Sequence, residues 1–301
     1  MVTRVLDGLG LYLEGRETVA TGFPSLDRLL PAGGVRRGSL VEWLASGADC
    51  LAGGDGGGAI SLACAVACRL ADPRWAEQSR ASQASTIVVV DRGQRFYPPA
   101  VIPWLDALAD ATGKGGGRPH LVVARPSRDD DELWTIDQAL RCPGVAAVLA
   151  WPRRVHATAM RRWQLASRAS GAVGLVVRGL SECGFFGRVP VGEPTGPSGP
   201  TWADAKLAIS PMAGESGADL AVRRLRISLA GGPWAGNEML VERSTELLLD
   251  LTNGREATRR HRAPARHAAP GVATGLQATG LQAPGLQKGR FQPEGVACRA
   301  S

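Results

Sequence analysis

Four short apolar runs, separated by segments long enough to form helices, constrain the fold of this chain more than any other feature. They are rich in β-branched and small residues and lie at 86–90, 121–124, 145–151 and 173–178. Such runs are typical of strands that are buried on both faces of a parallel sheet. A further strand is expected at 40–44. The alternation predicts a doubly wound, mostly parallel α/β domain.

The segments between these runs are expected to form helices that pack on the sheet. Residues 59–70 are small and apolar, and residues 130–141 and 155–169 have helical length and pattern. Farther upstream, Ser25 is expected to cap a short helix. Right-handed crossovers would place the loops that follow the strands along one edge of the sheet, where ligands of such folds bind.

The chain changes in character after residue 180. Residues 181–200 are rich in glycine and proline and predict a surface loop. An antiparallel extension of the sheet is expected from strands at 205–209, 221–229, 238–242 and 246–251. The predicted division is an N-terminal segment (1–20), a domain (21–254) with its core at 38–180 and antiparallel strands within 201–254, and a tail (255–301).

The tail carries most of the positive charge. It holds eight Arg and Lys residues and two Glu, which accounts for six of the seven formal net charges. A Gly-Leu-Gln triplet recurs in it every five residues from Gly275, and we expect disorder. The basic balance of the chain is therefore no argument for a nucleic-acid groove on the folded domain. The tail could tether the chain weakly to DNA, or it could serve solubility alone.

Composition places the chain among cytoplasmic globular proteins that keep free thiols. Its apolar runs are too short to span a bilayer, and no signal peptide is evident, so we expect no contact with a membrane. Cys64 and Cys68 share one face of the expected helix, without a second pair or a nearby His. We interpret them as core residues, and no metal or other cofactor is expected.

A glycine-rich loop precedes the first long helix. The spacing from Gly53 to Gly58 matches the first part of a Walker A motif, but Ala59 and Ile60 stand where Lys and Ser/Thr would follow. Neither side chain can neutralise phosphate charge or ligate Mg²⁺. The loop is interpreted as a degenerate phosphate-binding loop without function.

Other polar residues allow a structural and a functional interpretation. Asp91 ends a buried strand, and we interpret it as an acceptor that caps a loop, with a metal ligand or general base as the alternative. The acidic run 129–132 fits a helix N-terminus better than a cation site. Trp104 is expected to be partly exposed at a contact surface. Possible contacts to DNA or to an acidic partner are basic residues in or beside the helix 155–169: Arg154, Arg161, Arg162 and Arg168.

The order of these pieces resembles the RecA superfamily and, within it, the ImuA-like proteins that accompany error-prone translesion polymerases in bacteria. The resemblance covers about residues 20–230. Its motifs are Thr21-Gly22 with Leu26-Asp27, Gly33-Gly34, Gly38 with Glu42, Asp91, Tyr97-Pro98-Pro99-Ala100, Arg125-Pro126 through Leu133-Trp134, Gln138 to Arg141, and Arg161-Arg162 with Gln164-Leu165-Ala166.

The chain departs from an active recombinase at the catalytic positions. Besides Ala59 and Ile60, these are Arg92-Gly93 in place of a water-activating Glu, Trp151 after the strand that should end in a Walker B Asp, and Arg178 in place of a γ-phosphate sensor. The resemblance therefore implies a non-catalytic accessory protein of translesion DNA synthesis in the DNA-damage (SOS) response. Its implied partners are a Y-family-like scaffold protein, an error-prone polymerase subunit and the RecA recombinase, with weak contact to DNA.

Two alternatives remain open at this stage. The chain could be a RecA-like, DNA-dependent ATPase or recombinase in which an arginine replaces the Walker lysine; the candidates are Arg36, Arg37, Arg92 and Arg178. The broad relationship also includes SulA-like inhibitors of cell division.

Overall fold

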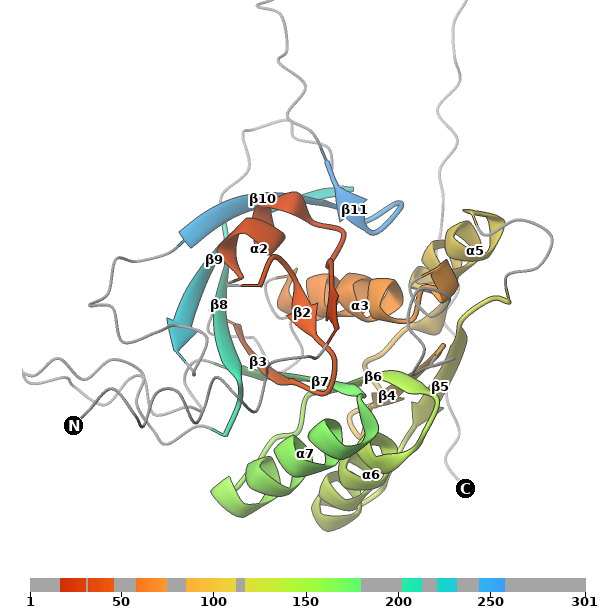
Figure 1. Cartoon of the computed structure of the whole chain (residues 1–301), viewed down its shortest axis with the longest axis vertical. Coiled ribbons are helices and arrows are strands. Elements are labelled where there is room, and N and C mark those ends of the chain that lie inside the picture. The colour runs from red at the N-terminus through yellow and green to blue at the C-terminus, as the bar shows by residue number, and fades with distance from the viewer. Residues whose placement is uncertain are drawn as a thin grey trace, which may run out of the picture. The chain divides into compact units, whose positions relative to one another are not determined.

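A large mixed β-sheet, with helices on both faces, forms the centre of the molecule (Figure 1). The computed structural model describes residues 17–30, 32–45, 58–74, 85–111, 117–179, 202–212, 221–231 and 244–257. Within these ranges the main sheet has nine strands in the order β11-β10-β9-β8-β3-β7-β6-β4-β5, and β1 and β2 form a separate pair.

The strands and helices follow one another along the chain as the alternation predicts. The strands are β1 (Thr18–Val19), β2 (Val35–Arg36), β3 (Leu40–Ala45), β4 (Thr86–Val90), β5 (His120–Ala124), β6 (Val145–Ala150), β7 (Val173–Gly179), β8 (Ala205–Pro211), β9 (Val222–Gly231), β10 (Ser244–Asp250) and β11 (Arg255–Glu256). The helices are α2 (Pro24–Leu29), α3 (Ala59–Leu70), the 3₁₀ helix η2 (Pro98–Ala100), α5 (Ile102–Ala111), α6 (Asp129–Arg141) and α7 (Ala157–Ser170).

The doubly wound α/β class is confirmed. β3 to β7 all pair in parallel, and the helix predicted at 59–70 has the same bounds in the structure. Strands β3 and β6 are buried along their whole length, as expected for strands with a layer on each face. β5 is the end strand of the described sheet and is only half-buried, because it pairs with β4 alone.

The expectation that residues 201–254 form only antiparallel strands is wrong for β8. This strand pairs in parallel with β3, and the antiparallel pairing begins between β8 and β9. More than twenty residues separate β7 from β8, enough for the chain to return to the same end of the sheet. β11 then continues the sheet beyond residue 254. The strand expected at 238–242, the loop 181–200 and the tail from 258 lie outside the described residues.

Two apolar clusters hold the helices on the sheet. The larger cluster lies on the face of the sheet that α3 and α5 cover, and the smaller lies under α6 and α7. Figure 1 shows these helices on the two faces of the sheet. Alternation along β3 sets the division, because Val41 and Trp43 belong to the first cluster and Leu40 to the second. In β9 only Leu225 and Ile227 are buried, which is the pattern of a strand with one covered face.

The cap expected at Ser25 is also wrong. Helix α2 begins one residue earlier, at Pro24, and Phe23 occupies the N-cap position without a side-chain hydrogen bond. Ser25 lies in the first turn, where its N–H and its hydroxyl both donate to the Glu256 carboxylate. Proline favours the first helical position because its missing N–H is not needed there.

No helix in the described ranges is long and apolar enough to cross a bilayer.

Candidate functional site

The carboxyl ends of the parallel strands β3, β7, β6 and β4 lie at one edge of the sheet. The residues that the sequence suggests for phosphate binding follow these strand ends. Parallel α/β sheets bind ligands at this edge, because loops and helix N-termini converge on it. The structure brings together the end of β7 at Arg178, the residue after β6 at Trp151 and the turn after β4 at Asp91.

The N-terminus of α3 packs against the curved part of the sheet. Gly58 is its N-cap, with a φ of 90° that disfavours a side chain. A Cβ atom on Gly58 would lie 2.8 Å from Cδ2 of Leu225 in β9. Ala59 is fully buried in the larger cluster, and Ile60 is half-buried against it. The position of a Walker lysine is thus filled by a core residue; Gly53 lies outside the described residues.

Asp91 holds the turn that follows β4. Its buried carboxylate accepts the backbone N–H groups of Arg95 at 3.0 Å and Phe96 at 2.9 Å, and Nε of Arg125 lies 3.9 Å away. Each of the two carboxylate oxygens thus accepts one backbone N–H group of the turn. The structural interpretation of Asp91, as an acceptor that caps a loop, is confirmed.

Trp151 occupies the position after β6 where a magnesium-binding acid would stand. Only 2% of its surface is exposed, and its ring centroid lies 6.3 Å from that of Phe96. Its indole N–H has no hydrogen-bond partner among the described residues. The end of β6 therefore presents an aromatic ring to the interior and no carboxylate to a metal ion.

Arg178 is neutralised inside the domain. Its Nη1 donates to Oε1 of Glu42 at 2.7 Å, and Nζ of Lys206 lies 3.6 Å from Oε2 of the same carboxylate. The three residues belong to neighbouring strands, β7, β3 and β8, and Glu42 is almost fully buried. Sequence reasoning missed this cluster. The sequence signal for it is a single charged residue in each of three otherwise apolar strands.

Two of the other arginines considered as substitutes for the Walker lysine, Arg37 and Arg92, have partners as well. Arg37 donates to the carbonyl of Leu70 and lies 3.7 Å from Glu17. Leu70 ends α3, about 18 Å from Gly58 at 1.5 Å per residue. Nη1 of Arg92 pairs with Asp129 at 3.0 Å.

The arginines of α7 do not share one face of the helix. Arg161 stacks over the ring of Trp202 at 4.5 Å, and Arg168 pairs with Asp204 at 3.0 Å, so both fasten α7 to the segment before β8. Arg162 points the other way, to Asp137 of α6, also at 3.0 Å. Arg154 precedes the helix, which begins at Ala157 with His156 as its cap, and it is exposed. Arg161 and Arg168, seven residues apart, thus face the segment before β8, whereas Arg154 lies outside the helix.

Trp104 is buried, contrary to the expected exposure. Only 6% of its surface is exposed, and its indole N–H donates to the carbonyl of Leu251 at 3.2 Å. The β10–β11 turn packs on its ring, because a Cβ atom on Gly254 would lie 2.7 Å from Cδ2 of Trp104. The sequence around Trp104 gives no hint of this contact, because the turn lies about 150 residues away.

The described residues contain no group of three acidic, His or Cys side chains that could hold a metal ion. Residues 129–132 form the first turn of α6, as expected. Burial raises the pKa of the Glu132 carboxyl, against the attraction of Arg92 and other arginines. Burial likewise raises the pKa of the Cys68 thiol to about 12 and that of Cys64 strongly, so both remain protonated core residues.

No family of known proteins matches this sequence, and none of the curated proteins is detectably similar to it.

Proposed function

We propose that the chain is a RecA-like, ImuA-like accessory protein of bacterial translesion DNA synthesis that binds protein partners and does not hydrolyse ATP. The observation that carries the proposal is Trp151. A buried tryptophan ends the strand where a RecA-type ATPase would need a carboxylate, and the surrounding turn is built to enclose it. Phosphoryl transfer assisted by a metal ion needs a carboxylate that holds the metal, and the end of this strand provides none.

Three further positions support the proposal independently. Ala59 is a core residue, Arg178 is held by Glu42, and Arg92 is held by Asp129. Each would have to leave its present partner before it could meet a nucleotide phosphate. The alternative, an ATPase with a displaced arginine, therefore needs a rearrangement at Arg37, Arg92 or Arg178 if one of them replaces the lysine.

A binding role is supported by exposed apolar side chains on the helices that pack beside each other. Trp134 of α6 is 61% exposed and Leu165 of α7 is 48% exposed. Exposed tryptophans are frequent anchors in protein interfaces. We therefore propose that a protein partner binds the outer surface of α6 and α7, with Arg162 and Arg154 beside the contact.

The experiment is co-purification of the tagged full chain from DNA-damaged cells of its source organism. The expected partners are a Y-family-like scaffold protein, an error-prone polymerase subunit and the recombinase. Trp134→Ala should lower their recovery severalfold. Arg118→Ala is the matched control, because it removes another exposed side chain, which pairs with Asp106 of α5 and lies on neither α6 nor α7. Absence of all three partners from the parent sample would contradict the proposal.

A further inference from the structure

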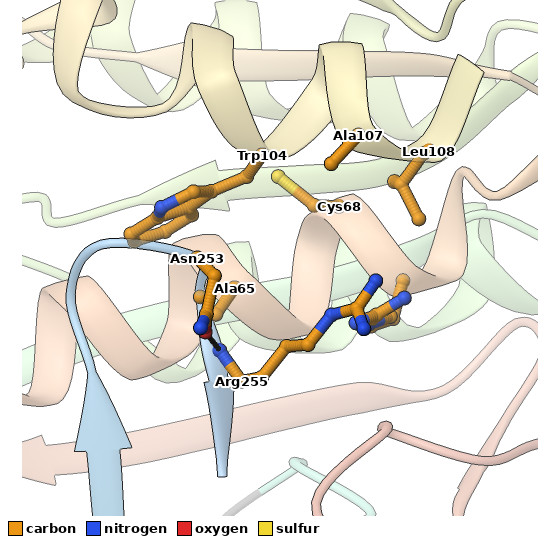
Figure 2. Close-up of a pocket in the computed structure, with 9 residues that line it drawn as sticks. Ala65, Cys68, Trp104, Ala107, Leu108, Asn253 and Arg255 are labelled. Atoms are coloured by element: carbon orange, nitrogen blue, oxygen red, sulfur yellow. Dashed lines mark hydrogen bonds between the residues drawn. The ribbon is translucent and has the colours of Figure 1, made fainter. Parts of the chain in front are cut away.

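Two arginines meet in a small pocket that lies between α3, α5 and the turn from β10 to β11. Arg69 comes from the last turn of α3, and Arg255 is the first residue of β11. Figure 2 shows Cys68 and Trp104 on facing helices, with Asn253 and Arg255 on the turn beside them. The pocket has an apolar wall and a basic wall.

Arg69 is held in place by the backbone next to it. A Cβ atom on Gly22 would lie 2.8 Å from Nε of Arg69, and Gly22 has a φ of 80°. The Arg69 side chain therefore packs against Gly22, which lies just before α2. Burial lowers the pKa of the Arg69 guanidinium, and the neighbouring charge of Arg255 lowers it further.

No ion pair in the described part of the chain neutralises these two arginines. Neither guanidinium forms an ion pair or a hydrogen bond with another described residue. The charge of Asp72 attracts Arg69, but Asp72 is bound by Arg74 through both oxygens, with the shortest contact at 2.6 Å. The carbonyl end of α3 favours one arginine at Arg69, but it does not explain a second one against it.

Arg255 also borders an open cleft of about 510 Å³ between α2 and the strands β10 and β11. The acids of this cleft already have partners. Glu246 pairs with Arg224 at 2.8 Å, and Glu256 accepts from Ser25. A ligand larger than a single ion could lie in this cleft and reach the arginine pair from it.

We propose that Arg69 and Arg255 form a binding site for a phosphate group. Two guanidinium groups offer up to ten N–H donors in planar forks that match the oxygens of phosphate, and Arg pairs are favoured where such recognition occurs. The indole of Trp104 and the thiol of Cys68 shield one side of the pocket from water. The phosphate can belong to inorganic phosphate, to a nucleotide or to single-stranded DNA. The site is independent of the function proposed above.

The test is isothermal titration of the full chain with three probes at constant ionic strength: inorganic phosphate, a nucleoside monophosphate and a short oligodeoxynucleotide. We expect at least one probe to bind, and Arg255→Gln to weaken that binding about tenfold or more, as loss of a charge-assisted hydrogen bond predicts. The side chain of Arg255 is exposed, so this variant keeps the fold. Arg69→Gln should weaken binding equally.

Arg226→Gln is the matched control, because Arg226 is an exposed arginine that lines neither the pocket nor the cleft, and Glu246 keeps its ion pair with Arg224. It should leave the affinity unchanged. The probe that binds most tightly identifies the source of the phosphate. If no probe binds the parent, or if Arg255→Gln and Arg226→Gln bind alike, the proposal is overturned.

Discussion

Arg178 and Glu42 form an ion pair of 2.7 Å between the neighbouring parallel strands β7 and β3. Lys206 approaches the same carboxylate from β8, on the other side of β3. The charged end of β7 is thus held against a buried carboxylate inside the sheet. Removing one partner would leave the other charge buried with less compensation.

Arg178→Met should therefore destabilise the domain by about 3 kcal/mol, because it removes the shorter of two contacts to a buried carboxylate. Urea denaturation followed by circular dichroism measures the loss. Glu42→Gln together with Arg178→Met should cost less than the sum of the two single changes, since the double variant has no buried carboxylate that has lost its closest cation. A loss below about 0.5 kcal/mol for Arg178→Met would show that the pair contributes nothing.

Restoring the Walker residues should harm the fold and restore no activity. Ala59→Lys puts an ammonium group into the larger apolar cluster, where Ala59 is fully buried, and should cost about 3 kcal/mol. Ile60→Thr, at the half-buried neighbour, should cost about 1 kcal/mol and is the control. Chemical denaturation measures both. If Ala59→Lys is as stable as the parent, the lysine has reached solvent and the first turn of α3 borders an open site.

Gly254→Ala should destabilise the domain more than Gly144→Ala. Both glycines have a positive φ, 63° and 85°, so both substitutions carry backbone strain. Only the Cβ at position 254 meets another group, the ring of Trp104 at 2.7 Å, whereas nothing lies within 4 Å at position 144. The difference in unfolding free energy should be about 1–2 kcal/mol. Equal losses would mean that the turn does not pack on Trp104.

Glu132→Gln should make the protein more stable at pH 7. The pKa of this carboxyl is raised in the folded chain by burial, above its ordinary value of 4.5. The folded state then binds the proton more tightly than the unfolded one, so stability falls as the pH rises through 4.5 and the higher folded pKa. The advantage of the variant should vanish below pH 4.5. Thermal melts from pH 3.5 to 7 measure it, with the exposed Asp130→Asn as control.

Local pattern was enough to predict the parallel core. The β-branched runs and the small residues of 59–70 give elements with nearly the same bounds as β4, β6, β7 and α3. Residues buried on both faces leave little choice of structure. Asp91 was also predictable, because a single acid after a buried strand meets the free N–H groups of its own turn.

The parts that depend on distant contacts could not be predicted in this way. Ser25 is bound by Glu256, and Trp104 is covered by the turn at Gly254, so neither role is visible in the neighbouring sequence. The direction of β8 depends on the path of the chain between β7 and β8 and on pairing with β3. The arginine pair at Arg69 and Arg255 likewise joins residues far apart in the chain.

The central claim of the proposal is that the carboxyl ends of the parallel strands do not bind or hydrolyse ATP. The most direct test is phosphate release by the purified full chain with ATP and Mg²⁺, with and without single-stranded DNA, together with titration of a fluorescent ATP analogue. We predict no turnover above background and no Mg²⁺-dependent binding that Arg178→Met or Arg92→Met alters. Micromolar binding with DNA-stimulated turnover would contradict the account and establish an ATPase with a displaced cation.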